Sequence, residues 1–139
     1  MKLDAIDRKI LQILQMDAEQ QVSQIAAQVG LSSTPCWRRI QRLKEAKVIT
    51  RQVCLLDPRQ INVGVTVFVM VRTRQHTQEW FERFHATTQA IPEVVEFYRM
   101  SGDIDYMLRV VVPDIAAYDT VYKRLIQGTD LFDVSSSFA

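Results

Sequence analysis

Residues 30–43 read GLSSTPCWRRIQRL, and this stretch decides the fold of the N-terminal half. Gly30 can stop one helix in the left-handed conformation, and Ser32 or Ser33 can cap the helix that follows. We expect Trp37 to lean toward the buried side of that helix. At about 100° per residue, the apolar side chains that define this side are Cys36, Ile40 and Leu43. The stretch therefore predicts an amphipathic helix.

The opposite side of this helix is polar and basic. Arg38 and Arg42 fall roughly opposite the buried side, and Arg39 lies at the border. An arginine fork can donate two bonds to guanine or pair with a phosphate, and Thr or Gln side chains can reach base edges. A basic helix face that is exposed to solvent and binds no DNA would have the same sequence pattern. The surrounding sequence therefore has to distinguish the two interpretations. With one residue from the segment that follows, the candidate DNA contacts are Ser33, Thr34, Pro35, Arg38, Arg39, Gln41, Arg42 and Arg51.

Two shorter helical patterns precede the basic helix. Asp4 can cap a first helix that runs to about Met16, and Ser23 can cap a second that ends at Gly30. Three short helices with a tight turn before the basic one form a helix-turn-helix. Residues 48–56, VITRQVCLL, are β-prone and predict a strand or wing. Within it, Arg51 either touches the phosphate backbone or is simply exposed.

Charge separates the two halves of this 139-residue chain. Residues 1–60 hold ten Lys and Arg against six Asp and Glu, while residues 61–139 hold seven against ten. Residues 38–51 carry six basic side chains and one acidic one, which suits a local nucleic-acid footprint. The acidic half should have another role.

The composition argues against membrane, secreted and metal-binding proteins. No apolar run is long enough to cross a bilayer, and residues 1–8 do not resemble a signal peptide, so we expect a cytoplasmic protein. Cys36 and Cys54 should then stay reduced, with Cys36 packing as a small apolar residue. Because His76 and His85 lack ligand spacing, we expect no metal and no resident cofactor.

From Ile61 the chain alternates strand and helix patterns. The order β-α-β-β-α-β is that of a ferredoxin-like split βαβ fold, with two helices on one side of a four-stranded antiparallel sheet. The fold class is therefore α+β, with domains at 1–50 and 63–139 and a linker strand and loop at 51–62. Strand patterns cover 63–72, 94–100, 106–112 and 131–139, and helix patterns cover 77–90 and 114–128.

The other side of this sheet should be an interface. Residues 63–72 and the MLRVVV segment at 107–112 offer apolar side chains to both faces, so a partner must cover the open one. A homodimer is the simplest cover. Two-fold pairing would also double the DNA site, since one small helix reads few base pairs. We therefore expect a pseudo-palindromic site on double-stranded DNA.

Several motifs together resemble the Lrp/AsnC (feast/famine) regulators of bacteria and archaea over essentially the whole chain. They are LDxxDxxIL at 3–11, VGLS at 29–32, AKVI at 46–49, LDP at 56–58, IPEV at 91–94, SGDIDY at 101–106 and SSSFA at 135–139. The resemblance implies a winged helix-turn-helix, an amino-acid-sensing C-terminal domain and dimers through the C-terminal sheets. It also implies rings of dimers up to an octamer, with ligand between neighbouring dimers.

The turn around Gly102 is where this resemblance implies the effector site. Asp103 or Asp105 could accept bonds from an amino acid's ammonium group, and backbone N–H groups freed by Gly102 could meet its carboxylate. Gly-Asp is also ordinary hairpin chemistry, and apolar strand residues beside it are often simply core. The candidate effector residues are Met100, Ser101, Gly102, Asp103, Asp105, Tyr106 and Met107.

Three details refine the resemblance. The residues at 34–38, 79–80 and 99–100 look closest to cysteine-responsive members, which makes cysteine the first effector to test. Members commonly have a proline where Ser33 stands, whereas here the proline is Pro35, so contacts in the DNA groove should differ. Members usually continue beyond the point that corresponds to Ala139, so we expect a C-terminal domain shortened at its end, with altered ring assembly and ligand response.

Two other interpretations stay open at the level of the sequence. One is a ferredoxin-like module that binds a small molecule without regulating anything, and the other is an architectural DNA-binding protein without an effector. No nucleophile and base pair or phosphate loop is evident, so we do not expect an enzyme. We predict a regulator of amino-acid metabolism whose DNA binding or oligomerisation responds to a small amino acid.

Overall fold

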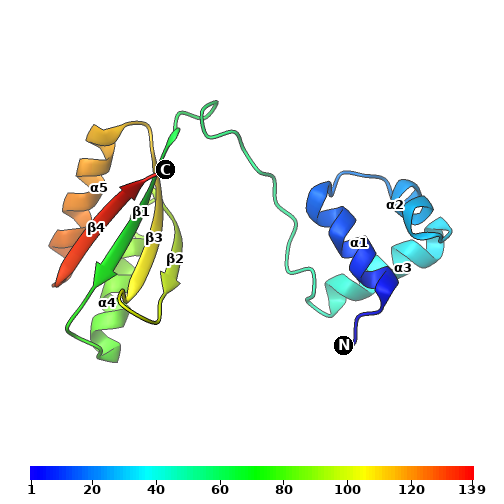
Figure 1. The fold of residues 1–139 in the computed structure, drawn as a ribbon, viewed down its shortest axis with the longest axis horizontal. Coiled ribbons are helices and arrows are strands. Elements are labelled where there is room, and N and C mark those ends of the chain that lie inside the picture. Colours follow the sequence, from blue (N-terminus) through cyan, green and yellow to red (C-terminus); the bar gives the residue numbers. More distant parts are fainter. The chain divides into compact units, whose positions relative to one another are not determined.

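The computed structural model describes residues 1–139 in two compact units, Met1–Leu55 and Leu56–Ala139. Each unit has its own hydrophobic core, formed by a separate set of buried side chains. The N-terminal unit is helical, and the C-terminal unit is a sheet with two helices (Figure 1). The chain is therefore an α+β protein, with a helix-turn-helix followed by a ferredoxin-like unit, as the sequence predicts.

The N-terminal unit consists of three helices: α1 (Ala5–Met16), α2 (Val22–Val29) and α3 (Ser33–Glu45). Asp4 caps α1 by accepting a hydrogen bond from the N–H of Asp7 at 2.8 Å. Gly30 ends α2 at φ 71°, a left-handed conformation that glycine adopts without strain, and Ser32 precedes α3 as its N-cap residue. The apolar faces of the three helices meet in one core: Ile10, Ile25, Ala26, Cys36, Ile40 and Leu43.

Two expectations for this unit are corrected. The second helix begins at Val22 with Gln21 as its N-cap residue, so Ser23 lies inside the helix and does not cap it. Residues 48–56, expected to form a strand or wing, belong to no strand or helix. The N–H and C=O groups of a strand need a neighbouring strand, and this unit offers none. The β-prone side chains are left exposed, Leu55 to 95%.

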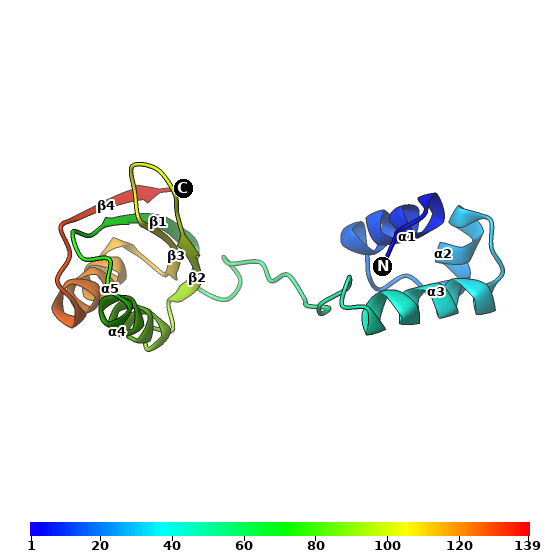
Figure 2. The same cartoon turned by 90° about the horizontal axis from the view of Figure 1, so that it is seen from below.

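The C-terminal unit consists of a four-stranded sheet and two helices: β1 (Val65–Arg72), α4 (Gln78–Gln89), β2 (Val94–Arg99), β3 (Tyr106–Val112), α5 (Ile115–Gly128) and β4 (Asp133–Phe138). The strands lie in the order β2-β3-β1-β4, and all neighbours are antiparallel. Both helices cover the same face of the sheet (Figure 2). None of the helices α1 to α5 combines the length and apolar character that crossing a membrane requires.

Side-chain alternation divides this sheet into a helix-covered face and an open face. Val67, Val69 and Val71 of β1 are fully buried in the core beneath the helices. Phe68 and Met70, which alternate with them, point to the other side and are only partly buried. The open face therefore still exposes apolar surface that the chain itself does not cover.

Candidate nucleic-acid interface and ligand site

The exposed side of α3 carries most of the predicted DNA contacts. Its first residues, Ser33 to Pro35, and the side chain of Arg38 are exposed, while Gln41 is half-buried. None of the chain's ion pairs involves Arg38. Its N–H donors are therefore available to a phosphate or a guanine. Arg51 is also exposed, in the extended segment after α3.

Two carboxylates hold the other two arginines of α3. The Asp7 side chain is 1% exposed and accepts hydrogen bonds from Arg39 Nη1 at 2.9 Å and Arg42 Nη2 at 3.0 Å. Asp4 accepts a further bond from Arg39 at 2.7 Å. A buried carboxylate is costly unless it is paired, and here two guanidinium groups neutralise it. We call Asp4, Asp7, Arg39 and Arg42 the α1–α3 clamp.

The α1–α3 clamp changes the ionisation of its members. The backbone N–H of Asp7 and the guanidinium of Arg39 stabilise the Asp4 carboxylate and lower its pKa to about 2. Hydrogen bonds to Asp4 and Asp7 raise the pKa of Arg39. Asp4 and Arg39 are therefore fully charged at neutral pH, and the guanidinium of Arg39 is directed at α1.

The sequence alone does not reveal this clamp, because its partners lie 32 to 35 positions apart. The one local sign is the Asp4-x-x-Asp7 spacing, which by itself predicts only a helix cap. The clamp divides the surface of α3 into two flanks. Arg39 and Arg42 lie on the flank tied to α1, whereas Thr34, Trp37 and Gln41 lie on the other, with Arg38 free between them.

Trp37 does not pack toward the core as expected. Its side chain is 52% exposed and lines a shallow hollow of about 260 Å³ together with Val22, Ser33 and Thr34. The apolar neighbour in this hollow is Val22, at the start of α2, which is too small to cover an indole. The helical angle places Trp37 near the buried side of α3. It does not show which side chains of α2 lie against the indole, and this tertiary packing determines how much of the indole is exposed.

Cys36 is fully buried beside α1 and α2, as the sequence predicts for a packing residue. Burial raises the pKa of its thiol, so the sulfur stays protonated and unreactive at neutral pH. Cys54 is exposed in the extended segment.

The turn predicted to hold an effector connects β2 to β3. Gly102 adopts φ 110°, a conformation open to glycine, and the N–H of Met100 donates to the carbonyl of Asp105 at 2.8 Å. Asp105 Oδ2 accepts a bond from the N–H of Thr73 at 2.8 Å, which fastens the turn to the end of β1. Asp103 is exposed. The two carboxylates thus differ, since one holds the turn and the other faces water.

The remaining candidate effector residues do not share one surface. Met100 and Ser101 are exposed in the turn, and Met107 is half-buried on the open face of the sheet. Tyr106 is 5% exposed and packs between Trp80 and other aromatic rings of the helix-covered core. Burial raises the pKa of its phenol. The structure therefore brings residues 100–105 together and sets Tyr106 apart from Met107.

Two arginines that the sequence did not single out stand at the same end of the sheet as this turn. Arg72 closes β1, one position after Val71 pairs with Tyr106 of β3. The guanidinium of Arg74 lies 4.0 Å from the centre of the Phe132 ring, in a cation-π contact. Both are exposed, so either guanidinium can pair with a carboxylate.

A polar network interrupts the open face of the sheet. Arg109 Nη2 donates to Glu96 Oε1 at 2.9 Å, and the Tyr98 hydroxyl donates to Glu96 Oε2 at 2.8 Å. The hydrogen bond from Arg109 lowers the pKa of Glu96. In the sheet, Arg109 stands directly opposite Phe68. A partner on this face would meet charged and apolar groups side by side.

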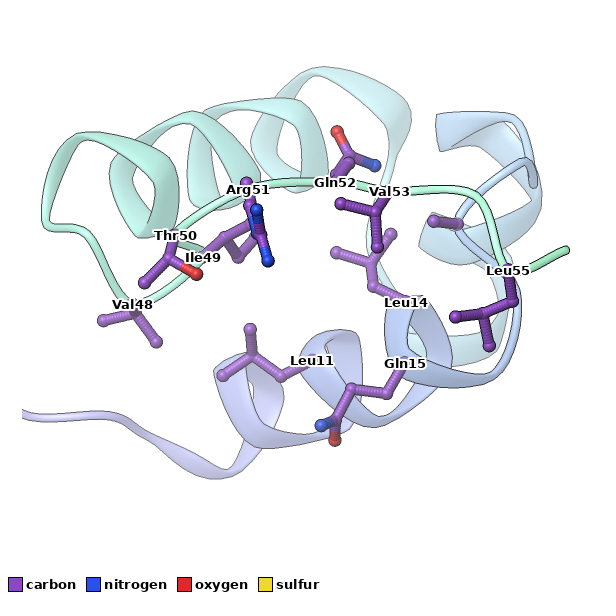
Figure 3. Close-up of a pocket in the computed structure, with 11 residues that line it drawn as sticks. Leu11, Leu14, Gln15, Val48, Ile49, Thr50, Arg51, Gln52, Val53 and Leu55 are labelled. Carbon is purple, nitrogen blue, oxygen red and sulfur yellow. The ribbon is translucent and has the colours of Figure 1, made fainter. Parts of the chain in front are cut away.

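Another hollow of the N-terminal unit lies between α1 and the extended segment. It is an open groove of about 440 Å³, with Leu11, Leu14 and Gln15 on one side and residues 48–53 and Leu55 on the other (Figure 3). Arg51 is the only charged side chain that lines it. A free amino acid needs an anionic partner for its ammonium group, so this groove is not suited to one.

Two family profiles match this chain. Residues 3–44 match the AsnC-type helix-turn-helix domain, and residues 66–139 match the Lrp/AsnC ligand binding domain. The chain is 46% identical to the glutamate uptake regulatory protein of Zymomonas mobilis, over 99% of this chain and 84% of that protein. It is 45% identical to the DNA-binding transcriptional activator DecR of Escherichia coli, over 99% and 91%.

Solved structures show the same fold. A crystal structure of an AsnC family transcriptional regulator from Agrobacterium tumefaciens is 60% identical, with a TM-score of 0.92 over 99% of this chain and 90% of that one. The transcriptional regulator NMB0573 of Neisseria meningitidis, in complex with L-Met, has the same TM-score and coverage at 32% identity. The whole chain therefore has counterparts of known fold.

Proposed function

This chain belongs to the Lrp/AsnC family of transcriptional regulators, and we therefore propose that α3 reads a two-fold-symmetric DNA site under the control of an amino acid. The chain is a DNA-binding regulator and not an enzyme. The observation that carries the proposal is the free guanidinium of Arg38, because the two arginines beside it are already held by carboxylates. The N–H donors of Arg38 are on the exposed side of α3, and an α-helix fits into the major groove of DNA.

Two copies of the chain would bind DNA together. Half-exposed Phe68, Met70, Met107 and Val111 on the open face of the sheet favour a homodimer through this face. Two α3 helices related by a two-fold axis would then read a pseudo-palindromic operator. Dimers would assemble further, up to an octamer, as the family resemblance implies.

The effector would bind at the turn between β2 and β3. Asp103 is exposed and can accept bonds from an ammonium group, and Arg72 or Arg74 can meet a carboxylate at the same end of the sheet. Cysteine is the first candidate. Glutamate and methionine are the direct alternatives, because one relative is named for glutamate uptake and one similar structure holds L-Met.

Replacing Arg38 tests the DNA-binding half of the proposal. Arg38→Ala should weaken binding to a duplex selected by this protein from a random pool by about tenfold and reduce the salt slope by about 1. Arg83→Ala, an equal loss of charge on the exposed side of α4, is the matched control and should bind like the wild type. If the wild type, Arg38→Ala and Arg83→Ala bind the duplex with equal affinity, the proposal that α3 contacts DNA is wrong.

A panel of the twenty amino acids tests the sensing half. Melting temperature and DNA affinity are measured for each, with cysteine kept reduced, and we expect cysteine to change both. Asp103→Asn should abolish the response, while Asp119→Asn on α5 should keep it. A response to methionine or glutamate alone would replace cysteine as the effector. No response to any amino acid would leave an architectural DNA-binding protein.

A further inference from the structure

Trp37 is a large apolar side chain left exposed on α3. The chain's other tryptophan, Trp80, is 2% exposed, whereas Trp37 is 52% exposed. A single exposed apolar residue is ordinary on a protein surface. This one is notable for its place, because it lies next to Arg38 on the helix that carries the predicted DNA contacts.

The surroundings of Trp37 form a small site of mixed character. The indole shares a hollow of about 260 Å³ with Val22 and with Ser33 and Thr34, which precede it by one helical turn. Neither acidic member of the α1–α3 clamp lines this hollow, and both pair with arginines on the opposite flank. The flank of Trp37 thus offers an apolar surface and two hydroxyl groups, with a free cation beside them.

The major groove of DNA has one apolar feature, the 5-methyl group of thymine. An apolar hollow beside an unpaired arginine is complementary to a thymine that stands next to a phosphate or a guanine. We propose that Trp37, Val22 and the methyl group of Thr34 receive the 5-methyl group of one thymine in each half of the operator. This inference rests on the proposed function and adds a base preference to it. Arg38 supplies charge, and Trp37 distinguishes thymine from cytosine.

The size of the expected effect follows from burying one methyl group. Removal of that group from DNA should cost about fourfold in affinity, which corresponds to about 0.8 kcal/mol. Trp37→Ala should cost at least as much at this base and should leave the other bases of the site unaffected. Because Trp37 is half-exposed and outside the core cluster, the variant should keep the melting temperature of the wild type.

The test uses deoxyuridine, whose base, uracil, is thymine without its 5-methyl group. Each thymine of the selected duplex is replaced in turn, and affinity is measured for the wild type, Trp37→Ala and the polar variant Trp37→Gln. We expect one position per half-site at which deoxyuridine weakens the wild type about fourfold but has no effect on either variant. The intrinsic fluorescence of Trp37, obtained as wild type minus Trp37→Phe, should also change on binding this duplex.

The outcomes separate this inference from the function on which it rests. If deoxyuridine weakens wild type and both variants equally at every position, Trp37 does not contact a thymine methyl group, while DNA binding stands. If the wild type is insensitive to deoxyuridine throughout, the inference also fails. If the protein selects no duplex from the pool at all, the proposed DNA-binding function is wrong, and the inference that rests on it is wrong as well.

Discussion

Asp7 joins α1 to α3 through a single buried carboxylate. Both of its oxygens accept hydrogen bonds from Arg42, and one of them accepts a bond from Arg39 as well. The side chain is 1% exposed, so water cannot replace these partners. The orientation of α3 against α1 therefore depends on an ion pair in addition to apolar packing.

Replacing Asp7 should destabilise the N-terminal unit strongly. Asp7→Ala leaves Arg42 without a carboxylate and Arg39 with Asp4 alone, and the lost charged hydrogen bonds should lower the free energy of unfolding by about 2 kcal/mol. Asp17→Ala, at an exposed position just after α1, is the control and should change stability little. Urea unfolding followed by helical circular dichroism measures both. A stability loss in Asp7→Ala no larger than that of the control would mean that the buried pair contributes nothing.

Asp4 should make the stability of this unit depend on acid. Folding lowers its pKa from 3.8 to about 2, so the folded state favours the ionised carboxylate. This contribution is complete above pH 3.8 and is lost as the pH falls toward about 2. Asp4→Asn should therefore show a shallower loss of stability than the wild type across that interval. Parallel curves of urea midpoint against pH would contradict the assignment.

At the scale of elements, α4 and α5 approach each other closely at Gly128. A Cβ atom at this position would overlap the side chain of Thr87, standing 2.7 Å from its Oγ1. The Thr87 hydroxyl already donates to the carbonyl of Arg83, which restricts its rotation. The contact leaves no room for a larger residue, although alanine would otherwise favour the helix.

Gly128→Ala should therefore destabilise the C-terminal unit, by about 1 kcal/mol. The closest atoms belong to the Thr87 side chain beyond Cβ, so Thr87→Ala combined with Gly128→Ala should recover most of the loss. Thermal unfolding of the two single variants and the double variant forms a complete cycle. Additive effects in this cycle would show that the two helices adjust without strain.

The elements were largely predictable from local pattern, and the exceptions have one physical cause. Local sequence pattern identified all five helices and the four strands of the sheet, and in the helices and in β1 and β3 this pattern corresponds to a regular buried face. Residues 48–56 have the composition of a strand but remain unpaired, since a strand needs a neighbour that local sequence does not supply. The α1–α3 clamp and the exposure of Trp37 were not predicted, for the same reason. Both depend on which residues distant in sequence lie beside α3.

At the scale of the whole molecule, the open face of the sheet is the surface through which we propose that copies associate. Met70 lies near its centre, on a strand paired on both sides, and Val111 and Phe68 extend the apolar surface. The Glu96–Arg109 pair within this face would be buried in a dimer and would favour one register, since a misplaced partner would leave a charge unpaired.

A charge placed on this face should separate the proposed dimer. Met70→Glu should weaken self-association by about a hundredfold, because a buried unpaired carboxylate costs several kcal/mol. Gln89→Glu, the same change of charge on the exposed end of α4, should leave the association unchanged. Sedimentation velocity over a range of protein concentrations measures both. An unaltered dimer in Met70→Glu would place the interface elsewhere on the unit.

The α1–α3 clamp has a consequence for protein engineering. Changing the DNA preference of a helix-turn-helix protein by transplanting its third helix assumes that this helix is an independent module. Here the third helix carries two cations whose counter-charges belong to the first helix and its cap. A chimera that received α3 alone would inherit both guanidinium groups without the acids that restrain them, and the smallest transferable module includes residues 4–16 as well.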